Sequence, residues 1–496
     1  MYLQGKSSRR STKRSNSVSP VKIGEGAFGC VHKPALTCKD AASKKKLKLS
    51  GVDTVSKIMT EDEASDEIRD NKTIESIDPR GEFTLSGTST VQCRPEYSLE
   101  NERAMDECDN DSGYSLSSAS LIVMPYAGES LAVIGKRFKK AVQELNAPQS
   151  AALSGRSQSL WSKLRSRSRS QSRSPSDSLT PLSPTEVTEK TRETIPSIDW
   201  RKFWGQCVFM FRGLQRIYES GYVHFDIKPH NMLYHLRRNR MTMIDFGLLS
   251  TRTRLLKKLR QSSSSVKFHF SHPFEYFFMT RKRFSQIVDR PNKPYYPQNS
   301  MSKDLQLRFN DALKVLLNYS DISQSHVARL ERDFDMFFKK AARLKNTENE
   351  YERMLAKEVR TFDSYGLGFS LLFILVQAWP YMRHTMSQDF YRSMYDLLYN
   401  MYTPDLFDRL DINDATVEFC ALLRKFNIPV PPPSRRQQLQ LQRKTRLRKT
   451  KLLRKRRPTA AATRKVFIPK SAQRDEKYSL MHDVEYPIEF KQSKNT

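Results

Sequence analysis

The chain has 496 residues, of which 38% are hydrophobic, and a formal net charge of +31 at pH 7. This length suits about two to four domains, and so low a hydrophobic content excludes a chain that is globular throughout. The charge is concentrated in residues 1–20, 156–176 and 419–474, which contain Lys and Arg but no Asp or Glu. The rest of the chain is almost neutral, so its basic character belongs to appendages.

Cysteine spacing and hydrophobic runs indicate in which cellular compartment the chain would function. The six cysteines show no CxxC pair, which indicates neither a zinc site nor a disulfide framework, and a reducing intracellular compartment fits best. The basic N-terminus lacks the apolar stretch of a signal peptide. Residues 364–382 form an uncharged run of membrane-spanning length, but glycine, glutamine and proline interrupt it. We therefore expect a buried core helix and no membrane partner.

The N-terminal region begins with a tail and a glycine-rich loop. Residues 1–18 are mostly Ser, Arg and Lys, and we expect them to be disordered. Gly24, Gly26 and Gly29 then give a G-x-G-x-x-G-x-V pattern that ends at Val31. The residues after Val31 are typical of a strand that proline breaks, so no helix follows the glycines. A strand–loop–strand unit covers nucleotide phosphates, whereas a dinucleotide-binding fold needs a helix at this point.

A strand and a helix are expected next. Residues 54–59 form a short β-type run that contains Lys57. Thr60 and Glu63 form a capping-box pattern, which predicts a helix from there to about residue 76. Glu67 and Asp70 lie on the same face of this helix as Glu63. That face can meet Lys57 if the helix packs against the sheet.

The middle of the chain alternates between folded segments and inserts. Residues 121–124 predict a buried strand, and a helix is expected from about residue 129. Residues 147–196 are rich in Ser, Arg, Pro and Thr and cannot form a core. Helical periodicity appears over 200–220 and returns over 362–426. The charged residues 285–355 between these regions predict a second, helical insert.

The most informative stretch is His224-Phe225-Asp226-Ile227-Lys228-Pro229, which is followed by Asn231 and by Asp245-Phe246-Gly247. It places a carboxylate, an ammonium group and a carboxamide on one loop. A β-hairpin can bring the second carboxylate back beside them. This set of groups suits in-line phosphoryl transfer, in which a carboxylate orients a hydroxyl and the other groups hold the phosphates and Mg²⁺.

On these motifs the chain resembles the eukaryotic-type Ser/Thr protein kinases, and most closely the divergent kinases of large nucleocytoplasmic DNA viruses. The viral likeness is carried by residues 26–34, 55–59 and 77–79. The resemblance implies an α+β, two-lobed protein-kinase fold, with a small β-sheet lobe that carries one helix and a large, mainly helical lobe. Disordered inserts and tails would complete the chain.

The implied organisation has five parts. They are a basic disordered tail (1–18), the small lobe and hinge (19–132), a helix plus Arg/Ser-rich disordered insert (133–197), the large lobe with its helical insert at about 285–355 (198–430), and a basic tail (431–496).

The resemblance also implies ATP and Mg²⁺ as cofactors and gives roles to the polar residues. Asp226 would orient the acceptor hydroxyl, and Lys228 would contact the γ-phosphate. Asn231 and Asp245 would ligate Mg²⁺. Lys57 would hold the α- and β-phosphates through an ion pair with Glu67, for which Asp70 is the alternative.

The remaining implied contacts surround the nucleotide or support the loop. Gly24, Gly26 and Gly29 would cover the phosphates. Met124 would lie beside the adenine, Pro125 would offer only its carbonyl, and Ala127 would offer both N–H and C=O. Val31 and Val55 would cover the adenine from above and Leu233 from below. Asp363 would tie down the catalytic loop, and Glu275 would pair with Arg409.

Two departures from the family pattern carry predictions. Phe225 stands where kinases usually have an Arg that receives a phosphorylated activation loop, and Phe cannot pair with phosphate. We therefore expect activity without activation-loop phosphorylation. Residues 248–272 contain six Lys or Arg and no acid, which favours acidic or already phosphorylated protein substrates. A loop that is merely solvated is the alternative.

Other functions remain open. A pseudokinase could serve as the scaffold of a nucleic-acid-binding or packaging protein, since residues 435–465 contain fourteen basic residues and could bind nucleic acid electrostatically. Small-molecule phosphotransferases of kinase-like fold share the His-x-Asp pattern, but Lys228 and Asp245-Phe246-Gly247 favour a protein acceptor. The viral likeness implies the cytoplasm or nucleus of an infected host cell, with packaging in the virion as an open alternative.

Overall fold

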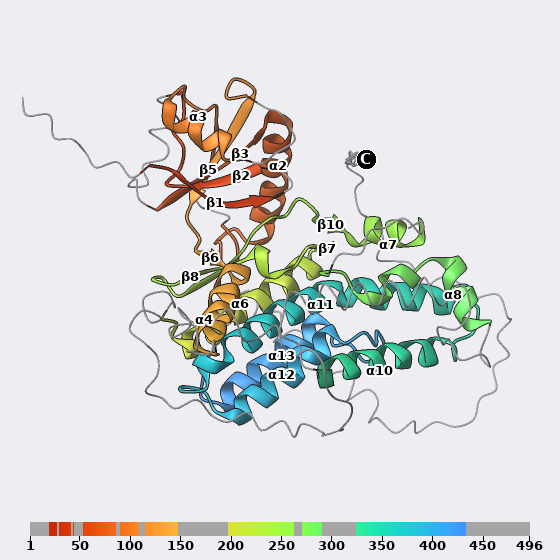
Figure 1. Ribbon diagram of the computed structural model, residues 1–496. Coiled ribbons are helices and arrows are strands. Elements are labelled where there is room, and N and C mark those ends of the chain that lie inside the picture. The colour runs from red at the N-terminus through yellow and green to blue at the C-terminus, as the bar shows by residue number, and fades with distance from the viewer. Residues whose placement is uncertain are drawn as a thin grey trace, which may run out of the picture. The chain divides into compact units, whose positions relative to one another are not determined.

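The computed structural model describes residues 19–26, 29–40, 43, 53–85, 90–108, 115–146, 197–261, 270–289 and 324–432. The chain divides into a unit of residues 1–431 and a unit of residues 432–496, and every element named below belongs to the first (Figure 1). The expected tail 1–18, the Arg/Ser-rich segment 147–196 and the basic segment 435–465 lie outside the described residues.

The N-terminal part is a five-stranded sheet with strand order β1-β2-β3-β5-β4, in which every neighbouring pair is antiparallel. Its strands are β1 (Val21–Gly26), β2 (Gly29–Lys33), β3 (Thr54–Thr60), β4 (Val91–Cys93) and β5 (Ala119–Pro125). Side chains alternate between the two faces. Met59 and Ile122 therefore pack with Ala64 of α2 (Glu61–Ile77), whereas Ile58 and Leu121 face α3 (Leu99–Asp106).

Helix α2 begins as the sequence predicts. The Thr60 side chain accepts a hydrogen bond from the backbone N–H of Glu63, and the Glu63 carboxylate accepts one from the N–H of Thr60. This reciprocal cap satisfies two N–H groups that a helix start otherwise leaves unpaired. At the other end, Ile74 and Ile77 are buried in the core of the helical part. The helix thus connects the sheet to the rest of the unit.

Four cysteines form disulfides, so the expectation from cysteine spacing was wrong. Cys30 pairs with Cys108 and Cys38 with Cys93, while Cys207 and Cys420 are free and buried. The partners are 78 and 55 residues apart in sequence. Tertiary packing of the α3 region and of the segment after β2 against the sheet brings them together, which is why no local spacing could reveal the pairs.

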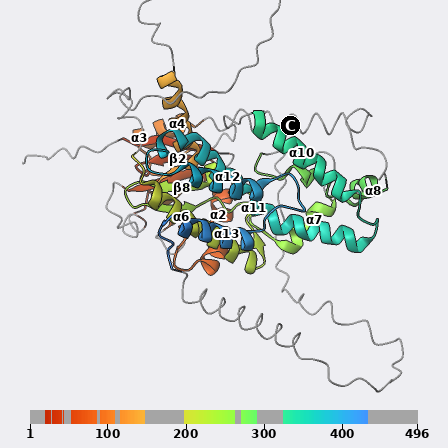
Figure 2. The same cartoon turned by 90° about the horizontal axis from the view of Figure 1, so that it is seen from below.

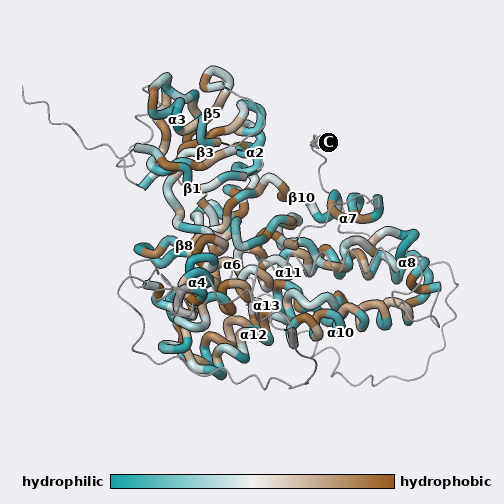
Figure 3. The backbone as a smooth tube through the Cα atoms, in the orientation of Figure 1, coloured by the Kyte–Doolittle hydropathy of each residue, from teal (hydrophilic) through white to brown (hydrophobic). Residues whose placement is uncertain are grey.

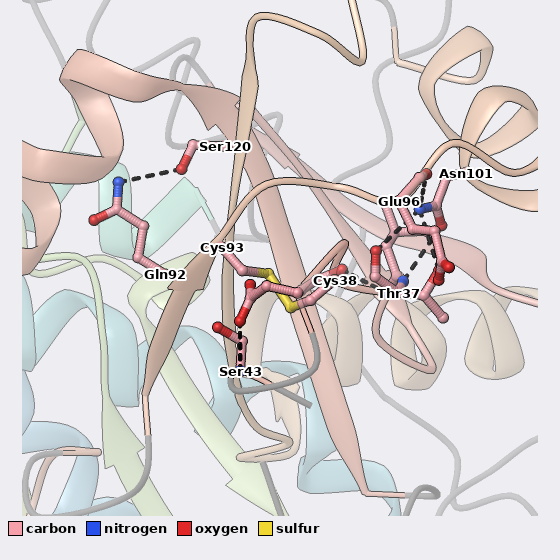
Figure 4. The surroundings of a disulfide bond; sticks show 11 residues. Thr37, Cys38, Ser43, Gln92, Cys93, Glu96, Asn101 and Ser120 are labelled. Atoms are coloured by element: carbon pink, nitrogen blue, oxygen red, sulfur yellow. Dashed lines mark hydrogen bonds between the residues drawn. A yellow bond between two sulfur atoms is a disulfide. The ribbon is translucent and has the colours of Figure 1, made fainter. Parts of the chain in front are cut away.

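The Cys30–Cys108 disulfide fastens the α3 region to the sheet, and the Cys38–Cys93 disulfide ties the segment after β2 to β4. Cys30 lies on β2 and Cys93 on β4, and Cys108 follows α3 directly. Asn101 of α3 supports the second bridge, because its amide donates to the carbonyl oxygens of Thr37 at 3.1 Å and Glu96 at 2.8 Å (Figure 4). The α3 region therefore covers the face of the sheet that α2 does not.

The C-terminal part is mainly helical. Its longer helices are α4 (Leu131–Asn146), α6 (Trp200–Glu219), α7 (Arg252–Gln261), α8 (Arg281–Val288), α10 (Gln324–Ala341), α11 (Glu348–Met382), α12 (Gln388–Tyr402) and α13 (Ile412–Lys425). One hydrophobic core joins α6, α11, α12 and α13, whose hydrophobic stretches appear brown in Figure 3. A second core lies where α7, α8 and α10 meet the N-terminal half of α11 (Figure 2).

Short strands and turns connect the helices. They are β6 (Glu129–Ser130), β7 (Tyr222–Val223), the 3₁₀ turn η2 (Pro229–Asn231), β8 (Met232–His235), β9 (Arg240–Met243), β10 (Ser250–Thr251) and the 3₁₀ turn η3 (Phe274–Phe278). Strands β6, β8 and β9 form one small sheet, and β7 pairs with β10.

Helix α11 begins earlier than expected, and its C-terminal half is the buried core helix that the sequence predicts. It begins at Glu348, so residues 348–355, which were expected to belong to the helical insert, are its first turns. Among the described residues it is the helix long and apolar enough to cross a membrane, but 89% of its apolar window is buried inside the protein. That burial is what a core helix requires, because its apolar residues contact other helices.

The disulfide pattern makes a countable prediction. Protein purified without reductant and then denatured should show two reactive thiols, Cys207 and Cys420, and six after reduction. A double variant Cys207→Ser, Cys420→Ser is the control and should show none before reduction. A thiol-reagent titration makes the measurement. Six reactive thiols in the unreduced wild-type protein would exclude both bridges.

Candidate active site

The loop of residues 224–231 is fixed from below by α11. The backbone N–H groups of His224 and Phe225 donate to the two carboxylate oxygens of Asp363 at 2.8 and 2.9 Å. A side chain at Gly366 would come within 2.4 Å of the carbonyl oxygen of Ile227, so only glycine allows α11 to approach this closely. The expectation that Asp363 ties down the loop agrees with these hydrogen bonds.

Asp226 is the centre of a hydrogen-bonded group. The Lys228 ammonium lies 2.7 Å from one carboxylate oxygen, and the Asn231 amide donates to the same oxygen at 3.0 Å and to the Asp226 carbonyl at 2.9 Å. The Ser271 hydroxyl donates to the other carboxylate oxygen at 3.4 Å. Asp226 and Asn231 are buried. These contacts restrict the carboxylate to one orientation.

The hairpin of β8 and β9 returns Asp245 to this loop. Met232 pairs with Met243, and the Ile244 N–H donates to the Asn231 carbonyl at 3.0 Å. Asp245 is the next residue, so it lies beside Asn231, as the spacing of the two motifs predicts. Its φ of 65° turns the chain away from the strand. Phe246 follows and is buried against the ring of His224.

The oxygen atoms of this group fit Mg²⁺. Both of the amide hydrogen bonds that Asn231 makes to Asp226 use its nitrogen, which leaves the amide oxygen available as a ligand. Mg²⁺ prefers such oxygen ligands and usually takes only one or two from the protein, with phosphates and water as the others. The described ranges contain no cluster of three or more His, Cys, Asp or Glu that could hold a metal alone. Asn231 and Asp245 offer oxygen atoms of the kind that Mg²⁺ prefers.

Lys57 pairs with Glu67, the first of the two acids considered. Their charged atoms are 2.6 Å apart, and their side chains are 17% and 24% exposed, so water screens the pair only in part. Asp70 makes no such contact with Lys57 among the hydrogen bonds and ion pairs of the described residues. Burial raises the pKa of Asp70 to about 6. The register of α2 on the sheet selects Glu67.

Strand register gathers the residues expected around a nucleotide. Val31 is opposite Lys57, and Val55 is opposite Met124, so these four side chains share one face of the sheet. Pro125 ends β5, and Ala127 follows it in a buried position. Leu233 lies on β8, where it pairs with Ser130 rather than with the five-stranded sheet.

The three loop glycines differ in how strictly the fold needs them. Gly29 has a φ of 129°, and an added Cβ would fall 1.9 Å from the carbonyl oxygen of Ile58. Only glycine fits there. Gly26 pairs with Gly29 across the hairpin, whereas a Cβ on Gly24 would meet nothing closer than 4.0 Å. The packing of the sheet therefore requires a glycine at position 29 but not at position 24.

A buried ionic group supports the segment after the site. Arg409 lies 2.5 Å from Glu275, the partner expected from the sequence, and 3.8 Å from Glu358, and all three side chains are fully buried. Burial, and next the charge of Glu275, raise the pKa of Glu358 well above its usual value. The neutral form of Glu358 is therefore favoured relative to that of an exposed glutamate. Sequence reasoning missed both Glu358 and Ser271, because only the tertiary fold brings them to their partners.

The pKa of the Asp363 carboxyl group predicts how the free energy of unfolding depends on pH. Burial raises its pKa from 3.8 to about 6, although the two backbone N–H groups oppose this. The stability linked to this group is therefore fully present below about pH 4 and lost as the pH rises through about 6. Relative to Asp363→Asn, the wild-type unfolding free energy should fall by roughly 3 kcal/mol across that window. Denaturant unfolding at several pH values measures it, and a difference that stays constant with pH would contradict the assignment.

Comparison with known proteins gives one kinase match. A stretch of 83 residues is 33% identical to the human (Homo sapiens) cell division cycle 7-related protein kinase, and it covers 16% of this chain and 14% of that protein. No protein-family model matches the chain. The partial similarity suggests kinase activity at most and identifies no substrate.

Proposed function

We propose that this protein is an ATP-dependent protein kinase that transfers the γ-phosphate to Ser or Thr hydroxyls of protein substrates. One observation carries the proposal. Lys228 and Asn231 both donate to the Asp226 carboxylate on a single loop, and the β8–β9 hairpin returns the chain to Asn231 at Ile244, the residue before Asp245. Phosphoryl transfer needs this combination, because it depends on positioning and charge rather than on covalent catalysis.

Each side chain would have one task. Asp226 would accept a hydrogen bond from the acceptor hydroxyl and take its proton, in an orientation that Lys228, Asn231 and Ser271 fix. Lys228, already 2.7 Å from Asp226, would offer its remaining N–H groups to the moving phosphoryl group. Mg²⁺ held by Asn231 and Asp245 would neutralise the charge that develops on the phosphates. Lys57, oriented by Glu67, would bind the phosphates that stay behind.

The fold supports a two-lobed kinase architecture. A five-stranded antiparallel sheet carries one long helix against it, and β5 leads through Pro125 and Ala127 into the helical part. In this arrangement Val31, Val55 and Met124 would line the adenine from the sheet, and Leu233 from the small sheet of β6, β8 and β9. The backbone of Ala127 would hydrogen-bond the base, while Pro125, which has no N–H, loses no donor.

The pseudokinase alternative is less well supported. Lys57, Asp226, Asn231 and Asp245 are all present, and the contacts described above involve each of them or its chain neighbour. Binding of nucleic acid by residues 435–465 concerns a segment outside the described residues, and it can coexist with catalysis. The viral affinity, the infected host cell and packaging in the virion rest on sequence motifs alone. The cysteine spacing no longer indicates a reducing compartment, because four of the cysteines form disulfides and disulfides persist where conditions are oxidising.

Acidic or phosphorylated protein acceptors remain the proposed substrates. Fewer of the Lys and Arg residues in the segment 248–272 can attract them than the sequence suggests. Strand β10 pairs with β7, so α7 begins beside the catalytic loop. Lys257 on α7 is exposed, whereas Arg260 is already paired with Glu352 at 2.6 Å. Lys267 lies outside the described residues. Attraction of an acidic peptide would therefore depend mainly on Lys257.

The Lys57–Glu67 pair gives a sharp test of the kinase proposal. Glu67→Gln removes the charge that orients Lys57 and should lower kcat/KM for ATP by about tenfold or more. The matched control is Asp66→Asn, the neighbouring acid on α2, whose side chain is 62% exposed and pairs with Arg69. This control should stay within about twofold of wild type. Equal effects of the two substitutions on labelled-phosphate transfer would remove Glu67 from the site.

The acceptor preference can be measured separately. A peptide library should show faster phosphorylation when acidic or phosphorylated residues flank the Ser or Thr. Lys257→Ala should reduce this preference by about threefold or more without changing the KM for ATP. Lys282→Ala on α8, also an exposed lysine, is the control and should leave the preference unchanged. A preference of the wild-type enzyme for basic flanks would refute the proposed substrate class.

A further inference from the structure

The backbone at Phe225 is held in an uncommon conformation. Its φ is 69°, in the left-handed region that bulky residues rarely adopt. Such a conformation costs roughly 1–3 kcal/mol and persists only where the surroundings enforce it. The adjacent residue is Asp226, so the direction of the proposed catalytic carboxylate depends on Phe225 staying in this conformation.

The Phe225 side chain supplies part of that enforcement. The ring is only 3% exposed. It stacks on Phe362 of α11, with centroids 4.4 Å apart and planes 19° apart, and it contacts His272 at 5.1 Å and Tyr276 at 6.1 Å. The Lys258 ammonium of α7 lies 4.7 Å from the ring centroid. One ring thus joins the catalytic loop to α11, to the segment before η3 and to α7.

Helix α7 is docked on the same core. Leu255 and Leu259 are buried in the cluster that contains Phe225 and Leu355 of α11. The Arg260 guanidinium makes two hydrogen bonds, at 2.9 and 2.6 Å, to Glu352 in the first turns of α11. These contacts hold the segment after Asp245 without any phosphate group.

An arginine would not serve at position 225. The ring at this position contacts Phe362, His272 and Tyr276 among the described residues, and the charged group that lies over it is another cation, Lys258. A buried guanidinium here would meet the positive charge of Lys258, and a buried charge without an acidic partner is strongly unfavourable. Both the residue type at position 225 and the packing around it therefore indicate an apolar contact at this point instead of an ionic one.

We propose that Phe225 is a positioning residue. Its ring, together with Leu255, Leu259 and Phe362, forms a clamp that couples docking of α7 on α11 to the orientation of Asp226. The clamp takes over the task that a phosphate–arginine pair would perform, so the site is permanently assembled. This inference rests on the proposed kinase function, and the docking of α7 is the part of it that can be measured without catalysis.

The test compares Phe225→Leu and Phe225→Ala with Phe284→Leu. Phe284 is fully buried on α8 in the same second core and makes its ring contact with Tyr351 rather than with Phe225. All three substitutions remove buried ring volume and should lower stability. Only those at Phe225 should speed hydrogen exchange of the α7 amides, by about tenfold or more. They should also lower kcat by a similar factor with the KM for ATP nearly unchanged, and Phe225→Tyr should restore most of both.

The outcomes separate the clamp from the kinase function. If α7 exchanges equally in Phe225→Leu and Phe284→Leu, the clamp is wrong whether or not the enzyme is active. If no variant and no wild-type sample transfers phosphate, the kinase function fails while the exchange data still decide the clamp. Phosphatase treatment of the wild-type enzyme should leave kcat unchanged, and a loss of activity would overturn the clamp as a replacement for phosphorylation. The milder Leu variant keeps the comparison available if Phe225→Ala does not fold.

Discussion

The contact between Asp363 and the backbone of residues 224 and 225 governs the geometry of the site. A carboxylate on the central helix α11 accepts both N–H groups, and Gly366 one turn later lets the loop lie directly on the helix. Helix α11 is packed on α6, α12 and α13 in the larger hydrophobic core. The loop is therefore attached to a rigid, closely packed part of the protein. Asp226, Lys228 and Asn231 follow within a few residues, so their mutual distances depend on this one attachment.

The same helix organises two cores with different roles. Its C-terminal half belongs to the larger core and carries the loop, while its N-terminal half, from Glu348 onward, receives α7, α8 and α10. Phe362 lies between the two halves and stacks on Phe225. Both rings belong to the second core, so this stacked pair is the place where that core meets the catalytic loop.

Local sequence patterns predicted what depends on local geometry. The capping box at Thr60 and Glu63 needs only one helical turn, and the return of Asp245 to Asn231 needs only a hairpin of known length. The sequence predicts Glu67 as the partner of Lys57 but keeps Asp70 as the alternative, because helix periodicity places both acids on the same face. Packing of α2 on the sheet decides between them, and that packing depends on residues far away in the sequence.

What the sequence could not show depends on distant pairing. The disulfides join residues 55 and 78 positions apart, and the row Cys30, Ile58, Leu121, Cys93 exists only once four strands have aligned. Arg409 pairs with both Glu275 and Glu358. These residues lie in the segment between α12 and α13, in η3 and in α11, so no sequence spacing relates them. Ser271 reaches Asp226 in the same way.

Transfer of labelled γ-phosphate from ATP, followed by identification of the modified amino acid, tests the central claim most directly. The wild-type protein should produce phosphoserine or phosphothreonine in an acidic protein acceptor, and Asp245→Ala should lower the rate by about a hundredfold or more while the protein stays folded. Absence of transfer by the wild-type protein with every acceptor, or an equal rate in the variant, would contradict the account.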